Sequence, residues 1–343
     1  MNQFQCDYVA GCHPKVLEAL SKTNLIEVPG YGEDDFCRSA ADKIRTACAL
    51  PEAGVYFMSG GTQTNLTVIG AVLRPHQGVV AADTAHIEAH ETGAIEATGH
   101  KVLTIANDDG KVTAEALDSL CREYWQNEEK PLLVQPGMLY ISFPTETGTL
   151  YSLAEIEALA EVCRRHKLFF YLDGARLAYG LAASEDVTMK DIARLTDAFY
   201  IGGTKCGTLV GEALVVKNTD LQRDFTAIMR QRGALLAKGR LIGVQFDALF
   251  TDGLYEAIGV QAIADARAIR TAFEKVGVKP AGSSPTNQQF MILTPAQMQI
   301  LRRRHRFELC KTHADGSATV RFCSAWSTTR TALAELLEDI ATL

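Results

Sequence analysis

Short apolar runs alternate with segments of helical periodicity through the first two thirds of the chain. The runs that we expect to form strands are 55–58, 79–82, 102–105, 139–143, 168–172, 198–201 and 213–216. Apolar residues recur every three or four positions at 13–22, 33–50, 62–73, 114–125, 153–166 and 189–195, which predicts helices. Strands that alternate with helices predict a mostly parallel, seven-stranded sheet covered on both faces. Because only a short loop separates the last two strands, we expect one of them to be antiparallel.

The pattern changes after about residue 220. Two long helical stretches are expected at 219–250 and 254–276, followed by short strands at 290–293, 307–311 and 318–323. A final helix is expected at 329–340, with Thr328 as its N-cap. We therefore expect an α/β fold with three parts. An N-terminal arm (1–20) packs with the small domain, a large domain spans 21–245, and a smaller α+β domain spans 246–343.

Composition and charge exclude several classes of protein. The net charge is −7 and no long Lys/Arg block is present, so we expect no nucleic-acid partner. The N-terminus lacks the basic and apolar regions of a signal peptide, and no apolar stretch is long enough to cross a membrane. The nine cysteines are scattered without a CxxC pair, which predicts a reducing cytoplasm and no disulfides.

The most informative residue is a lysine in a loop between two apolar strands. Lys205 lies in AFYIGGTKCGTLVGEALVV, flanked only by small residues, and Asp173 ends the apolar run FFYLD about thirty residues upstream. A lysine in such a slot suits a Schiff base with an aldehyde cofactor, and an aspartate suits the protonated ring nitrogen of pyridoxal 5′-phosphate (PLP). Taken alone, Asp173 fits equally well a strand-end carboxylate of the kind that binds magnesium.

Two upstream motifs fit the same cofactor. Gly60, Gly61 and Thr62 follow a strand and open a helix, where free backbone N–H groups bind anions such as phosphate. His86, in ADTAHIEAHETGA, can stack on a pyridine ring. A rival reading makes His86 and His90 metal ligands, but their spacing matches no common metal motif and no further ligand cluster is evident, so we expect no metal.

Two arginines are candidates for binding a carboxylate. Arg176 follows Asp173 by three residues and is expected to face the same site. Arg321 lies in the short strand ATVRFC, and its planar guanidinium suits a substrate carboxylate. From the residues alone, an exposed strand arginine is an equally good interpretation of Arg321.

At this point the motifs resemble those of the threonine aldolase family. YGED (31–34), GGTQTN (60–65), YLDGARL (171–177), GGTKCG (202–207) and VRFCSAWSTT (320–329) occur in that family's order and spacing. The family consists of PLP enzymes with the aspartate-aminotransferase-like fold, fold type I. The resemblance implies that Lys205 carries the cofactor, that Asp173 binds the ring nitrogen and that His86 stacks on the ring. It further implies that Gly61 and Thr62 hold phosphate and that Arg176 and Arg321 approach the substrate carboxylate.

The resemblance also implies a homodimer or homotetramer with sites at the subunit interface. Tyr31, and a basic residue such as Arg232 or Lys238, are then expected to reach a neighbour's site. Two features depart from the family. Cys6-Asp7 stands where the family often has Ser-Asp, so Cys6 replaces a hydroxyl expected near the substrate. The loop 143–149 lacks the family's histidine, which leaves His86, Glu146 or an ordered water as the base.

The activity that the resemblance implies is retro-aldol cleavage of a β-hydroxy-α-amino acid to glycine and an aldehyde. L-threonine, L-allo-threonine and phenylserine all fit as substrates. A β-eliminating lyase or an aminotransferase shares the same core motifs and stays open. A nucleotide- or metal-binding α/β module without a covalent cofactor is the remote alternative.

Overall fold

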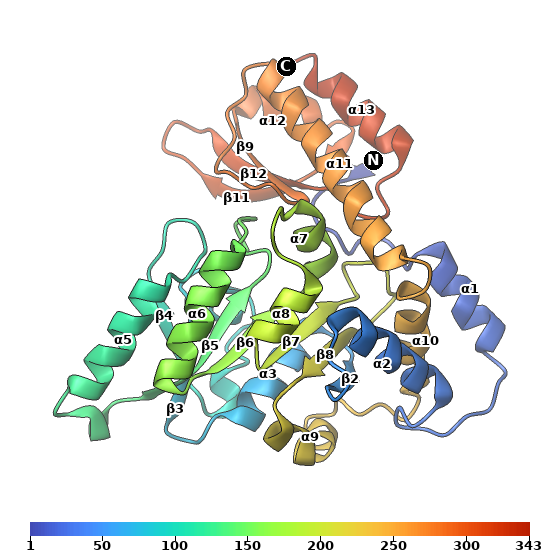
Figure 1. Ribbon diagram of the computed structural model, residues 1–343. Helices are drawn as coiled ribbons and strands as arrows, with labels where there is room; N and C mark the ends of the chain where they lie inside the picture. Colours follow the sequence, from blue (N-terminus) through green and yellow to red (C-terminus); the bar gives the residue numbers. More distant parts are fainter.

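The computed structural model describes all 343 residues, with a large lower body and a smaller upper body (Figure 1). A seven-stranded sheet runs through the lower body in the order β2-β8-β7-β6-β5-β3-β4. Its strands are β2 (Gly54–Met58), β3 (Gln77–Ala82), β4 (Val102–Ile105), β5 (Gln135–Ser142), β6 (Phe169–Asp173), β7 (Ala198–Gly202) and β8 (Glu212–Val216). Only β8 is antiparallel to its neighbours, β2 and β7. The mostly parallel sheet with one antiparallel strand is therefore confirmed.

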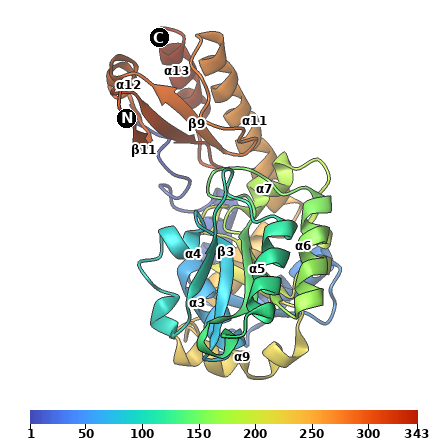
Figure 2. The same cartoon turned by 90° about the vertical axis from the view of Figure 1, so that its left-hand side faces the viewer.

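Helices cover both faces of this sheet, as expected for strands that are buried on both sides. One layer contains α5 (Ala114–Gln126), α6 (Leu153–His166), α8 (Met189–Leu195) and α2 (Asp35–Cys48). In this order, each helix contacts the next. On the opposite face, α3 (Gly61–Val72) packs against α9 (Thr219–Gln231) (Figure 2). The remaining helical segments of the lower body are α1 (Pro14–Thr23), α4 (His86–Ala89), η1 (Glu96–Thr98), η2 (Lys130–Leu132), α7 (Leu177–Ala183) and α10 (Arg240–Leu249).

The expected helix at 219–250 is wrong, because the structure has two helices there, α9 and α10. The chain turns between them at Gly233, whose φ of 69° lies in the left-handed region that glycine adopts without strain. Gly233 follows Arg232, which ends α9. Helical periodicity on both sides of the turn concealed this break.

The N-cap expected for the last helix is wrong by one residue. α13 (Arg330–Ile340) begins after Thr329, whose side chain accepts a hydrogen bond from the backbone N–H of Ala332. Thr328 instead accepts a hydrogen bond from the N–H of Ala325 and closes the preceding turn. Threonine is a favoured N-cap residue at either position, so the sequence alone did not show which of the two adjacent threonines caps the helix.

The upper body is a three-stranded antiparallel sheet with helices on one side. The strand order is β11-β12-β9, with β9 (Gln288–Leu293), β11 (Glu308–Thr312) and β12 (Ala318–Cys323). α11 (Leu254–Lys275), α12 (Pro295–Leu301) and α13 complete it. Phe273, Phe307 and Phe322 lie in a second hydrophobic core of 15 buried residues, separate from the 64-residue core of the lower body.

The first residues of the chain join the upper body. β1 (Asn2–Gln3) pairs in parallel with β10 (His305–Arg306), and Phe4 is fully buried in the second core. α1 packs against α10 of the lower body instead. The expected arm 1–20 therefore contains two segments with different partners, and the division at residues 20 and 245 stays a prediction.

One long helix links the two bodies. α11 contributes Ile258 and Ala262 to the first core and Ile269 and Phe273 to the second. It packs closely against α7, where a Cβ built on Gly259 would overlap the carbonyl oxygen of Ala178. A glycine at position 259 therefore allows the two backbones to approach.

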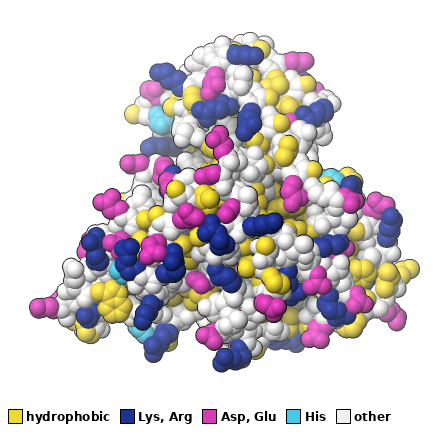
Figure 3. Space-filling view, viewed as in Figure 1, with side chains coloured by type: hydrophobic (Ala, Val, Ile, Leu, Met, Phe, Trp, Pro, Cys, Tyr) yellow, Lys and Arg dark blue, Asp and Glu magenta, His cyan; other side chains and the backbone are white.

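Charges of both signs are mixed on one face of the molecule. On the face shown in Figure 3, Lys and Arg side chains are interspersed with Asp and Glu, and no broad area carries a single sign of charge. None of the helices combines the length and hydropathy needed to span a bilayer.

Gly259→Ala tests the close packing of α11 on α7. The added methyl group overlaps backbone rather than a flexible side chain, so we expect the free energy of unfolding to fall by about 1–3 kcal/mol. We expect this loss of stability even though alanine has the higher helix propensity, by up to about 1 kcal/mol relative to glycine. Chemical denaturation measures it, with Val260→Ala on the exposed side of α11 as the control. A stabilised Gly259→Ala protein would show that the backbones are not in contact.

Candidate active site

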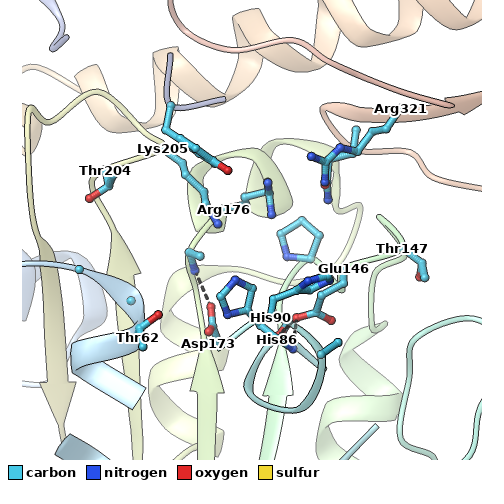
Figure 4. A pocket seen from close by; sticks show the side chains of 18 of the residues that line it. Thr62, His86, His90, Glu146, Thr147, Asp173, Arg176, Thr204, Lys205 and Arg321 are labelled. Carbon is cyan, nitrogen blue, oxygen red and sulfur yellow. Dashed lines mark hydrogen bonds between the residues drawn. The ribbon is translucent and has the colours of Figure 1, made fainter. Parts of the chain in front are cut away.

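A cavity of about 990 Å³ lies between the carboxyl ends of β5, β6 and β7 and the small sheet of the upper body (Figure 4). Ligands of open α/β sheets bind at this edge. Eight of the residues predicted for the site line the cavity: Gly60, Gly61, Thr62, His86, Asp173, Arg176, Lys205 and Arg321. Residues separated by more than 250 positions in the chain thus face one space.

Asp173 ends β6 and forms the floor of the cavity. Its carboxylate accepts hydrogen bonds from the hydroxyl groups of Tyr140 and Tyr200, each at 2.6 Å. It also accepts from the Asn65 amide at 3.1 Å and from the backbone N–H of Ala175 at 2.9 Å. Burial raises the pKa of Asp173, but the charge of the nearby His86 and the tyrosine hydrogen bonds lower it by more, so the net pKa lies below its usual value. The floor therefore carries a negative charge at neutral pH.

Lys205 enters the cavity from the loop between β7 and β8. Two contacts fix this loop: Tyr179 donates a 2.6 Å hydrogen bond to the Lys205 carbonyl, and the Glu212 carboxylate accepts a 2.7 Å bond from the N–H of Gly203. Burial lowers the pKa of the Lys205 amine and the charge of Arg176 lowers it further, whereas nearby carboxylates raise it less. The net pKa is lowered, so a larger fraction of the amine is neutral and nucleophilic.

The N-terminus of α3 forms an anion site at one side of the cavity. Its N-cap, Gly60, makes no side-chain capping bond, which leaves the first backbone N–H groups of the helix free to bind an anion. A Cβ on Gly60 would meet nothing within 4 Å, so open space lies beside it. At Gly61, a Cβ would come within 2.9 Å of the Tyr200 hydroxyl. Thr62 and Thr204 add hydroxyl groups to the same wall.

A hydrogen-bonded chain holds His86 beside the floor. The Nδ1 of His86 lies 2.7 Å from the buried carboxylate of Glu91, which also accepts a 2.8 Å bond from Asn65. Burial lowers the pKa of His86, but the hydrogen bond to Glu91 and the charge of Asp173 raise it by more, so the net pKa is raised. His90 is a neighbour, with its ring 5.6 Å from that of His86. The structure contains no group of three or more side chains placed to hold a metal ion.

The two arginines have different surroundings. Arg176 donates from Nε and Nη2 to the Asp7 carboxylate, at 2.6 and 3.1 Å, and Asp7 also accepts from Asn287. Arg321 donates to two neutral groups, the Gln288 side chain at 3.0 Å and the Gln5 carbonyl at 3.1 Å, and its buried Nε has no partner. Arg321 is therefore better placed to take a carboxylate, whereas Arg176 is already paired with one.

Four predicted site residues do not line the cavity of their own chain: Cys6, Tyr31, Arg232 and Lys238. Cys6 is buried and only Tyr8 of the arm reaches the cavity, with its ring 6.0 Å from the Lys205 Nζ. Arg232 ends α9 and extends toward Gly70, away from the anion site. Tyr31 packs under Arg230, and Lys238 is exposed.

Several residues of the site were not predicted from the sequence. Asn65, Glu91, Tyr140 and Tyr200 hold Asp173 and His86, and Asp7 holds Arg176. A usable signal existed for the tyrosines, because each follows apolar residues near the carboxyl end of a strand next to β6.

The chain is similar to known proteins over its whole length. The family model for β-eliminating lyases matches residues 3–337. A solved structure of Leishmania major threonine aldolase superposes with a TM-score of 0.96 at 39% identity, covering 100% of this chain and 99% of that one. The low specificity L-threonine aldolase of a Pseudomonas species is 28% identical over 346 residues, 98% of this chain and 96% of its own length. Thermus thermophilus aspartate aminotransferase shares the fold alone, with a TM-score of 0.73 at 15% identity over 99% and 91% of the two chains.

Asp7→Asn tests the buried pair that holds Arg176. The variant keeps the shape of the side chain but leaves the guanidinium without a counterion, so we expect the free energy of unfolding at pH 7 to fall by about 3–5 kcal/mol. Burial raises the pKa of Asp7, while Arg176, Lys205 and the hydrogen bonds lower it by more, giving a net lowered pKa. Its stabilisation is therefore present at neutral pH and lost as the pH falls through its folded-state pKa.

Urea denaturation of the wild type and Asp7→Asn at neutral and acid pH measures this effect. The two proteins should converge in stability at acid pH. Asp35→Asn, which removes an exposed carboxylate paired with Arg38, serves as the control and should change little. Equal stability of wild type and Asp7→Asn at pH 7 would contradict the role of the pair.

Proposed function

Because the chain belongs to the β-eliminating lyase family, we propose that it cleaves β-hydroxy-α-amino acids of the L-threonine type into glycine and an aldehyde, with PLP as cofactor. One observation carries the proposal: Lys205 and Asp173 open onto the same cavity, together with an uncapped helix N-terminus. The full-length relatives with threonine aldolase in their names support the substrate class.

The residues of the cavity fit PLP at each of its functional groups. The free N–H groups at Gly61 and Thr62 suit the phosphate, and the ionised Asp173 suits a protonated ring nitrogen. The amine of Lys205 suits the aldehyde, since its lowered pKa favours the nucleophilic form. His86, held by Glu91, is placed to lie against the ring. When bound, PLP accepts the electron pair that a broken bond leaves on the substrate Cα.

The substrate carboxylate belongs at Arg321. Arg321 lines the cavity from β12 and has only neutral hydrogen-bond partners, so it gives the cavity a cation opposite the floor. Arg176 is held in place by its ion pair with Asp7, and its positive charge lowers the pKa of Lys205. Fixing the carboxylate orients the Cα–Cβ bond, and orientation of this kind contributes on the order of 7–11 kcal/mol in well-aligned reactions.

We further propose that the protein works as a homo-oligomer, dimer or tetramer, in the cytoplasm. Exposed apolar side chains lie at and after α1, where a second copy of the chain would cover them: Leu17, Leu25 and Ile26. Tyr31, Arg232 and Lys238, which do not line the cavity of their own chain, then become candidates for the neighbour's site.

All nine cysteines carry free thiols, as in chains kept in a reducing compartment. Light scattering that finds an active monomer would contradict the oligomer.

Product analysis tests the proposed reaction. Protein supplied with PLP and L-threonine, L-allo-threonine or phenylserine should release glycine and the corresponding aldehyde in equal amounts. Pyruvate and ammonia would instead indicate a β-eliminating lyase, and a new amino acid formed from a keto acid would indicate an aminotransferase. A purified protein that does not bind added PLP and instead retains a nucleotide or metal would refute the proposal.

Lys205→Ala tests the attachment of the cofactor. The variant lacks the only lysine that lines the cavity, so borohydride reduction in the presence of PLP should leave the cavity unlabelled and the protein inactive. Mass spectrometry of wild-type peptides should find the label on Lys205. Lys190→Ala, an exposed lysine on α8, should label as the wild type does. Full labelling and activity of Lys205→Ala would contradict the assignment.

A further inference from the structure

Glu146 is a half-buried carboxyl group that lines the cavity, and only one of its two oxygens is used in hydrogen bonds within the protein. It lies in the loop between β5 and α6, and one of its oxygens, Oε1, is fixed by two donors. The Ser142 hydroxyl donates to it at 2.7 Å and the backbone N–H of His86 at 3.0 Å. The two hydrogen bonds to the Glu146 side chain both end on Oε1, so Oε2 accepts none, and Glu146 lines the cavity.

We propose that Glu146 is the catalytic base that takes the proton of the substrate's β-hydroxyl group. The inference rests on the proposed cleavage of β-hydroxy-α-amino acids. The hydroxyl proton passes to Oε2, the O–H electron pair forms the aldehyde C=O bond, and the Cα–Cβ bond breaks. The electron pair of that bond is left at Cα, where bound PLP would stabilise it, and Cα takes up one proton from solvent to become glycine. The proton that Glu146 gains is returned to solvent, so the step consumes nothing.

The surroundings of Glu146 suit this task. Burial raises its pKa and the charge of Asp173 raises it further, against smaller opposing effects of the Ser142 hydrogen bond and of His86. The net pKa is raised, and a carboxylate of higher pKa is a stronger base. The other titratable groups that face Glu146 are Arg176, Tyr140 and Tyr151. Both tyrosine hydroxyls have raised pKa values and stay neutral, so they do not compete for the proton.

The two histidines of the cavity are weaker candidates. The Nδ1 of His86 is bonded to Glu91, and the raised pKa of the ring favours its protonated form, which cannot accept a further proton. His90 has a pKa lowered by burial and by the charge of His86, but it is exposed and makes no side-chain hydrogen bond that would orient a ring nitrogen. Glu146 alone combines a fixed orientation with a free acceptor atom.

Glu146→Gln tests the proposal, because the amide carbonyl can keep both hydrogen bonds of Oε1 while the side chain can no longer take a proton. The rate of aldehyde formation should fall by about 10²–10⁴-fold. Exchange of the glycine Cα proton with D₂O involves no β-hydroxyl group, so its rate should stay within about threefold of wild type. The PLP dissociation constant and the urea midpoint of the apoprotein should also match wild type. Glu146→Asp, which keeps a carboxylate, should recover part of the rate.

Controls separate this proposal from the proposed function. Glu88→Gln removes an exposed carboxylate of α4 and should behave as wild type. A wild-type protein that exchanges the glycine proton but forms no aldehyde would refute the proposed function itself. An active wild type with Glu146→Gln forming aldehyde within about threefold of its rate would refute only the role of Glu146. Two other results would also refute the role of Glu146. In one, His90→Gln rather than Glu146→Gln loses aldehyde formation. In the other, Glu146→Gln slows aldehyde formation and glycine exchange equally.

Discussion

The negative charge of Asp173 inside the protein is the constraint that shapes the rest of the site. A buried carboxylate is costly unless several donors satisfy it, and here four donors do so. Two of them come from tyrosines on the strands that flank β6 in the sheet, and the others from α3 and from the turn after β6. The sheet and its first crossover helix thus prepare the floor of the cavity before any ligand binds.

The same arrangement extends to the walls. Asn65 donates to both Asp173 and Glu91, and Glu91 holds His86, so one amide links the floor to the histidine beside it. On the opposite side, the arm supplies Asp7 to Arg176 while β12 supplies Arg321. Since Asp7 is bonded to Asn287 beside β9 and Arg321 lies on β12, both in the upper body, the cavity is complete only when the two bodies are held together, as α11 does.

Much of this could be predicted from local patterns, and the remainder depends on long-range contacts. Strand and helix periods predicted the sheet, and the lysine loop predicted its antiparallel strand. The positions of Lys205, Asp173 and Gly60–Thr62 followed from strand ends, where polar residues face a common edge. The partners of these residues could not be predicted in this way: Asn65 is 108 positions from Asp173, and Asp7 is 169 positions from Arg176. The break between α9 and α10 was missed because periodicity does not register a single left-handed glycine.

A crystal structure of the protein with PLP tests the central claim most directly, since it shows both ends of the cofactor at once. The account predicts a covalent link from the Lys205 Nζ and an Asp173 oxygen about 2.7–2.9 Å from the ring nitrogen, the length of a charge-assisted hydrogen bond. A cofactor whose ring nitrogen faces solvent or another group, with Asp173 bound only to its protein donors, would contradict it.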